Sequence, residues 1–152
     1  MTTVADVLKT IADDKSLVIF NAIALSNIGS DILISRLQLT RKQYYSRMST
    51  LLKTGIVKRE MGKYSLTTFG MILYHAQEII GKAVNQIWKL KAIDSISVSC
   101  NGVLPQEQFL RIIDTLIANQ EIKNILLEQI KEKPHTFETL NQIPVPNLDQ
   151  KK

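Results

Sequence analysis

The basic side chains of this chain are gathered in one short segment. Eight lysines and arginines and a single acid, Glu60, lie between Arg36 and Lys63, which gives this segment a charge of +7, while the other 124 residues sum to −2. A local excess of this kind is the electrostatic signature of a surface that binds a polyanion. Charge alone fits a solvated basic face equally well. The secondary structure of this segment must therefore distinguish a binding surface from a solvated face.

Residue types that support catalysis or metal binding are scarce. The chain has one cysteine, Cys100, and two histidines, His75 and His135. A single cysteine excludes an intramolecular disulfide and a zinc site built from several cysteines, and no P-loop, GxSxG or HExxH motif is present. We interpret His75 as structural and Cys100 as a reduced thiol, with redox sensing or pairing to a second copy as its alternatives. We expect no metal, no cofactor and no enzymatic activity.

Length and composition indicate a folded protein. The 152 residues correspond to about one domain, and the apolar share of 45% with 22% charged residues excludes a wholly disordered chain. No apolar run reaches the length of a membrane span. The first residues lack the basic start and apolar run of a signal peptide. We therefore expect a cytoplasmic protein with no membrane partner.

Apolar residues at helical spacing predict the N-terminal elements. A short amphipathic helix is expected over 3–13 and a second helix, apolar nearly all round and therefore central, over 16–26. A short helix over 31–37 follows, with Ser30 or Asp31 as its N-cap and Ile32, Leu33 and Leu37 facing inward.

The basic segment begins at a tight turn over 38–40. Thr40 is a good N-cap for a helix over 41–54, and Gly55 should end that helix in the left-handed conformation. Two β-prone runs around Gly62-Lys63 predict a hairpin.

The helix over 41–54 is predicted to have two different faces. Its apolar side chains share one face and should enter the core: Tyr44, Met48, Leu51 and Leu52. The opposite face is basic and polar, with Arg47 at its edge: Arg41, Lys42, Gln43, Tyr45, Ser46, Ser49 and Lys53. Tyr45 would either contact a partner or pack on the protein surface.

The C-terminal half is predicted to be helical and to associate. Helical periodicity indicates one long helix over 68–93, a linker over 94–103, and helices over 105–118 and 120–132. A helix over 68–93 would be about 40 Å long, more than a small domain covers. Six residues of its apolar stripe are candidates for dimerisation: Ile72, Ile79, Ile80, Ala83, Ile87 and Trp88. The alternative for Trp88 is that it lines a ligand pocket instead of a dimer interface.

The order helix, short helix, tight turn, helix, glycine, hairpin resembles a winged helix-turn-helix. The likeness rests on residues 30–70. The run from Leu39 to Val57, ending Lys53-Thr54-Gly55-Ile56-Val57, is similar to the recognition helix and wing entry of small archaeal and bacterial transcriptional regulators. The run Tyr64-Ser65-Leu66-Thr67-Thr68-Phe69-Gly70 is similar to their Tyr-x-Leu-Thr-x-x-Gly return strand, in which the glycine lies at the start of the next helix.

We therefore expect a mainly α protein in three parts. The resemblance implies a winged helix-turn-helix DNA-binding domain with a short β-hairpin wing over 1–70. A long helix and a C-terminal helical hairpin over 71–133 would serve dimerisation. Beyond residue 133 the apolar pattern is lost, which predicts a flexible tail over 134–152.

The function expected from this fold is transcription regulation by a homodimer that binds specific double-stranded DNA. The helix over 41–54 would enter the major groove, with its first residues at base edges, arginine or lysine preferring guanine and glutamine adenine. The candidate contact residues are Thr40, Arg41, Lys42, Gln43, Tyr45, Ser46, Arg47, Lys53, Lys58, Arg59 and Lys63. The alternative is a winged-helix protein-interaction module in a transcription or chromatin assembly.

Overall fold

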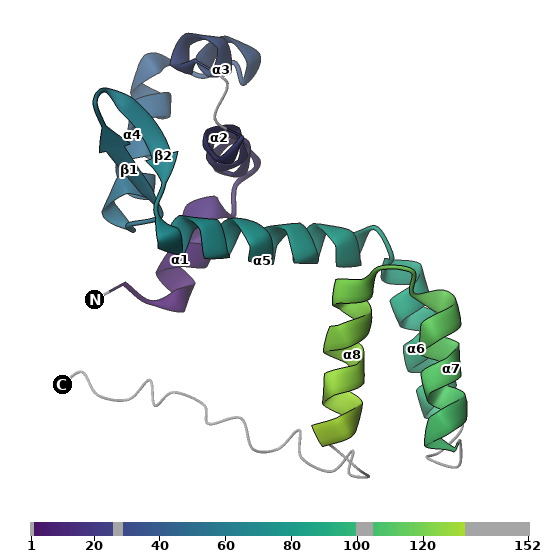
Figure 1. The fold of residues 1–152 in the computed structure, drawn as a ribbon. Helices are drawn as coiled ribbons and strands as arrows, with labels where there is room; N and C mark the ends of the chain where they lie inside the picture. Colours follow the sequence, from purple (N-terminus) through teal and green to yellow (C-terminus); the bar gives the residue numbers. More distant parts are fainter. Residues whose placement is uncertain (1, 26–28, 100–104, 133–152) are drawn as a thin grey trace, which may run out of the picture. The chain divides into compact units, whose positions relative to one another are not determined.

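The computed structural model describes residues 2–25, 29–99 and 105–132 (Figure 1). Its elements are α1 Val4–Ile11, α2 Asp14–Ala24, α3 Ser30–Arg36, α4 Arg41–Lys53, β1 Val57–Glu60, β2 Lys63–Leu66, α5 Thr68–Val84, α6 Ile87–Ser99, α7 Gln106–Leu116 and α8 Gln120–Glu132. The expectation of a mainly α protein with one short antiparallel hairpin is confirmed for this part of the chain. The chain divides into two compact units, Met1–Ile80 and Gly81–Lys152, and α5 runs across the boundary.

The two N-terminal helices begin at side-chain caps. Thr3 and Asp6 form a capping box at α1, in which each side chain accepts the other residue's backbone N–H, at 3.1 and 3.0 Å. Asp13 caps α2 by accepting the backbone N–H groups of Lys15 and Ser16, both at 3.1 Å. The helices expected over 3–13 and 16–26 are thus confirmed, although α2 starts two residues earlier because Asp13 supplies its cap.

Helix α3 begins differently from the prediction. Its N-cap is Gly29, whose carbonyl accepts the N–H groups of Ile32 and Leu33 at 3.1 and 3.2 Å, and no side chain caps it. The expected cap by Ser30 or Asp31 is wrong, since both residues already lie in the first turn. Leu33 is buried as expected, but Ile32 is exposed, because a helix of this length presents only a narrow inward face.

The turn into α4 and the end of α4 follow the sequence pattern. Gln38 adopts a left-handed φ of 50°, and Leu39 is buried behind it. Thr40 is the N-cap of α4, as predicted. After α4 ends, Gly55 has a φ of 74°, so the left-handed terminator expected there is confirmed.

The hairpin closes through a two-residue turn. Strands β1 and β2 pair antiparallel with Glu60 opposite Lys63, which leaves Met61 and Gly62 as the loop. Both loop residues have a positive φ, 50° and 76°, the pattern of a type I′ turn.

Thr67 and Gly70 fasten the return strand to the end of α4. The Thr67 hydroxyl donates to the Gly55 carbonyl at 2.6 Å and accepts the Gly70 N–H at 2.9 Å, while the Thr67 N–H donates to the Ile56 carbonyl at 3.1 Å. A Cβ on Gly70 would lie 1.9 Å from the Ile56 carbonyl oxygen. Only glycine fits at this start of α5.

The core of the first unit is built from all four of its leading helices and the start of the hairpin. Its buried residues are Val7, Ile11, Ile19, Phe20, Ala22, Leu33, Leu39, Tyr44, Met48, Leu51, Ile56 and Val57. Helix α2 is central through Ile19 and Phe20, but Val18 on the same helix is exposed, so its all-round burial is not observed. This core fixes α4 by its apolar face.

The single helix expected over 68–93 is wrong. Helix α5 ends at Val84 and α6 begins at Ile87. The Gln86 N–H donates to the Ala83 carbonyl three residues back, at 3.0 Å, which tightens the last turn of α5. Asparagine at position 85 favours such a break because its side chain competes for backbone hydrogen bonds.

The second unit encloses a separate core. Ile93, Ile113, Ile117 and Ile122 are its buried residues, and they come from α6, from α7 and its C-cap, and from α8. The helix expected over 105–118 is confirmed with shifted bounds, and the one expected over 120–132 is confirmed with the predicted bounds. The linker expected over 94–103 is helical up to residue 99, and its remainder, like the tail expected over 134–152, lies outside the described residues. None of the helices described is long and apolar enough to cross a membrane.

Candidate nucleic-acid interface

Helix α4 has the two faces that its sequence predicts. Tyr44, Met48 and Leu51 are 2%, 1% and 0% exposed, and Leu52 is half-buried against the same core. The predicted outward residues are exposed except for Arg47 and Ser49, which are half-buried: Arg41, Lys42, Gln43, Tyr45, Ser46 and Lys53. The helix therefore offers a polar, basic surface along its solvent side.

The two cations at the start of α4 are scarcely neutralised by other residues that the structure describes. The Arg41 side chain is 82% exposed, and its only ion pair among the described residues joins its guanidinium to the Asp31 carboxylate at 4.0 Å. Exposed pairs at such a distance contribute little. Lys42 forms no ion pair or hydrogen bond with any residue that the structure describes. Both charges are available to an external anion.

The side chains of Thr40 and Gln43 cap the N-terminus of α4. The Thr40 hydroxyl accepts the Gln43 N–H at 3.2 Å, and the Gln43 side-chain oxygen accepts the Thr40 N–H at 2.9 Å. A bidentate contact with adenine uses the oxygen and the nitrogen of a glutamine amide together. Because the cap already uses this oxygen, Gln43 has mainly its amide N–H groups left for a partner.

Arg47 ties α4 to α2. Its guanidinium lies 3.5 Å from the Asp13 carboxylate and donates to the Gln43 carbonyl at 3.4 Å, and its side chain is 28% exposed. The Ser16 hydroxyl, which donates to the same carboxylate, and the Arg47 guanidinium beside it hold the pKa of Asp13 below its usual value. Arg47 thus positions the helix more than it presents charge outward.

Tyr45 is held against a buried ring. Its ring packs edge-to-face on that of Tyr44, with centroids 5.3 Å apart and an interplanar angle of 80°, yet Tyr45 stays 52% exposed. Burial raises the pKa of the Tyr44 phenol. Tyr45 is therefore an anchored, half-exposed aromatic platform on the face that carries Arg41 and Lys42.

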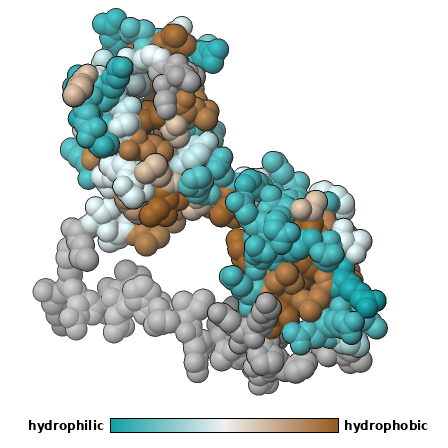
Figure 2. All heavy atoms as spheres, viewed as in Figure 1, coloured by the Kyte–Doolittle hydropathy of each residue, from teal (hydrophilic) through white to brown (hydrophobic). Residues whose placement is uncertain are grey.

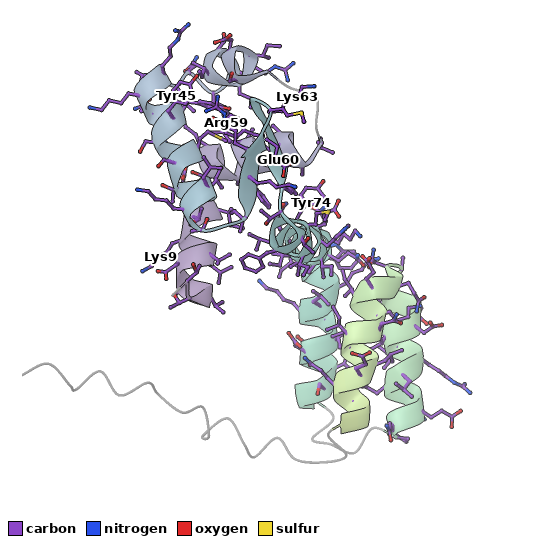
Figure 3. All side chains as sticks on the ribbon, turned by 60° about the vertical axis from the view of Figure 1, so that its left-hand side comes forward. Lys9, Tyr45, Arg59, Glu60, Lys63 and Tyr74 are labelled. Carbon is purple, nitrogen blue, oxygen red and sulfur yellow. The ribbon has the colours of Figure 1, made fainter. Side chains whose placement is uncertain are left out.

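The hairpin adds a second group of cations beside α4. The Lys58 ammonium pairs with the Glu60 carboxylate at 3.0 Å, and the Arg59 guanidinium lies over the Tyr64 ring at 5.5 Å. Lys63 is exposed and unpaired among the described residues. Figure 3 shows Tyr45 at the same end of the first unit as Arg59 and Lys63. The start of α4 and the hairpin therefore both place basic residues at this end of the first unit.

Sequence reasoning missed three residues of this region. Asp13 neutralises Arg47 from 34 positions away, a pairing that no local pattern reveals. Thr67 joins Gly55, which follows α4, to Gly70 in α5, and the signal for this role was its place directly before a helix with a glycine three residues on. Met61 occupies the hairpin tip, where a methionine before Gly62 departs from the residues that this turn prefers.

The candidate dimerisation residues are divided between the units. In the first unit Ile72 and Ile80 are exposed and Ile79 is half-buried; in the second, Ala83 packs against the core while Ile87 and Trp88 are exposed. Figure 2 shows exposed hydrophobic residues on each unit. The Lys89 ammonium lies 5.5 Å from the centre of the Trp88 ring.

Comparisons with protein-family models, with characterised proteins and with solved structures find no match to this chain. Among the described residues, no three acidic, histidine or cysteine side chains lie close enough together to hold a metal ion. The function must therefore be inferred from the basic surface itself.

Proposed function

We propose that this protein is a sequence-specific double-stranded DNA-binding transcription regulator that places α4 in the major groove. The observation that carries the proposal is the start of α4, where two exposed cations stand at the positive end of a helix dipole. Cations at a helix N-terminus are unfavourable, by about 0.3–1 kcal/mol each. A bound phosphate would remove this cost, because backbone N–H groups and side-chain charges would then face an anion.

Other helices of this chain avoid that arrangement. Five of those described have an acid in the first turn: Asp6, Asp14, Asp31, Glu107 and Glu121. Helix α4 has none, and it alone among the described helices begins with two cations, Arg41 and Lys42. Among the described helices, a pair of cations with no acid in the first turn occurs at the start of α4 alone, which supports a role for these residues in binding.

The surrounding elements support a winged helix-turn-helix interpretation. Helix α3, the turn at Gln38 and α4 follow the order of a helix-turn-helix, and the hairpin occupies the place of a wing. A single helix fits the major groove, and its N-terminal residues reach base edges most easily. Arg41, Lys42, Tyr45 and Ser46 would contact base edges or the adjacent phosphates, while Lys53 and Lys63 would meet backbone phosphates.

We also propose that the protein acts as a homodimer in the cytoplasm. Exposed apolar residues on α5 and α6, Ile72, Ile80, Ile87 and Trp88 among them, supply surface that association would cover. Two copies would double the contact with DNA and match a palindromic site.

Salt dependence tests the proposal. Four exposed cations without a close internal partner, Arg41, Lys42, Lys53 and Lys63, would neutralise about four phosphates per copy, so the logarithm of affinity should fall with the logarithm of salt at a slope of about −4 for one copy and about −7 for a dimer. Fluorescence anisotropy with a labelled random-sequence duplex measures this slope.

A duplex enriched from a random pool by binding to the protein tests sequence specificity. It should bind at least about a thousandfold more tightly than the pool itself. No detectable binding to any duplex at low salt would contradict the proposal and favour the protein-interaction module. Equal affinity for the pool and the enriched duplex would leave DNA binding but remove sequence specificity.

A further inference from the structure

The tip of the hairpin carries an apolar side chain in an unfavourable backbone conformation. Met61 has a φ of 50° and is fully exposed, with a relative accessibility of 102%. The type I′ turn that it shares with Gly62 prefers asparagine or glycine at this position. Methionine gains no local hydrogen bond from the left-handed region, as asparagine would, and here it gains no burial either. Strain retained at an exposed position directs attention to function.

The residues around Met61 are charged and mostly basic. Lys58, Arg59 and Lys63 lie on the two strands that lead to the tip, and Glu60, the only acid of the hairpin, is paired with Lys58 at 3.0 Å. An apolar tip flanked by cations suits a partner with an anionic exterior and an apolar interior. A DNA duplex has both, since its phosphates enclose stacked bases.

The tip lies beside the helix that we place in the major groove. Figures 1 and 3 both show the hairpin next to α4, and Figure 3 places Arg59 and Lys63 at the same end of the first unit as Tyr45. A duplex held by the start of α4 would therefore also meet the hairpin tip. The adjacent minor groove is where apolar side chains enter between base pairs in other DNA-bending proteins.

We infer that Met61 inserts into the minor groove as a wedge between two base pairs and kinks the duplex that α4 binds. The inference rests on the proposed DNA-binding function. The unbranched methionine side chain adapts to the irregular gap between unstacked bases. Unstacking costs a few kcal/mol per step, and the bend is compensated by the additional contacts it permits.

Ligase-mediated circle formation by short DNA tests the wedge. Fragments of about 100 base pairs are shorter than the persistence length of about 150 base pairs, so they close slowly unless a protein bends them. Wild-type protein should accelerate closure. Met61→Asn should abolish this acceleration and weaken duplex binding about tenfold, the effect of losing the burial of one apolar side chain. Its melting temperature should not fall, because asparagine tolerates a positive φ.

Two further variants make the result decisive. Met61→Leu keeps an apolar wedge and should retain most of the acceleration, and Met71→Gln, which alters an exposed methionine on α5, should behave as wild type. Normal binding and closure by Met61→Asn would overturn the wedge while leaving the proposed function intact. A wild-type protein that binds no duplex would overturn both. Loss of binding to anionic phospholipid vesicles in Met61→Asn, with DNA closure unchanged, would assign the tip to a lipid surface instead.

Discussion

Replacement of the first two residues of α4 by acids, Arg41→Glu with Lys42→Glu, is expected to abolish duplex binding and to leave the fold intact. Each substitution removes a cation and adds an anion at the surface nearest the phosphates, so affinity should fall at least about a hundredfold at moderate salt. The same change places acids at the N-terminus of a helix, where they are favourable by about 0.3–1 kcal/mol each. The variant should therefore bind DNA far less well while melting no earlier than wild type.

The matched control reverses two cations elsewhere. Lys9→Glu with Lys91→Glu changes the net charge by the same amount, and both lysines are exposed. Lys9 lies on α1, at the opposite end of the first unit from Tyr45 (Figure 3). This control should lower affinity only a few-fold, through the general loss of positive charge. Equal losses in the two double variants would mean that net charge, and not the α4 surface, governs binding.

Replacement of Gly70 by alanine is expected to destabilise the first unit strongly. The added Cβ would lie 1.9 Å from the Ile56 carbonyl oxygen and 2.9 Å from its carbon, and both atoms belong to backbone just before β1. Relief of this clash requires the start of α5 to move away from Ile56 and the Thr67 hydrogen bonds to be disturbed. We expect a loss of about 2–3 kcal/mol in the free energy of unfolding, measured by urea denaturation.

Gly81 supplies the control for Gly70 within the same helix. A Cβ at Gly81 meets no atom within 4 Å, so Gly81→Ala should raise stability by about 0.5–1 kcal/mol through helix propensity alone. Opposite signs for the two alanine variants are expected. The same small effect at both positions would show that the close approach between Gly70 and Ile56 does not exist in solution.

Much of the fold follows from short-range patterns. The bounds of α4 follow from Thr40 and Gly55, and its core face follows from residues three and four apart. The break between α5 and α6 does not follow from such patterns, because apolar residues continue on both sides of it and outweigh the weaker signal of Asn85. The cap of α3 was misplaced because polar residues that could cap a helix also fit inside its first turn.

The charge of the surface is harder to predict than the fold, because it depends on residues that are far apart in the sequence. The sequence identifies the cations between Arg36 and Lys63, but it does not tell which are neutralised by the fold. The Asp13 carboxylate pairs with the Arg47 guanidinium, and the Gln43 side-chain oxygen is used in the cap by accepting the Thr40 N–H. The prediction of adenine contact by Gln43 is weakened for that reason, while Arg41 and Lys42 are the principal candidates for contact under the proposed function.

Titration of ¹⁵N-labelled protein with a short DNA duplex shows which surface meets DNA. The largest changes in backbone amide resonances are expected over residues 40–47 and 58–63, which cover the start of α4 and the hairpin tip. They should diminish together as salt is raised. Changes confined to α6, α7 and α8, or spectra unaltered at a large excess of duplex, would contradict the assignment of α4 as the helix that enters the groove.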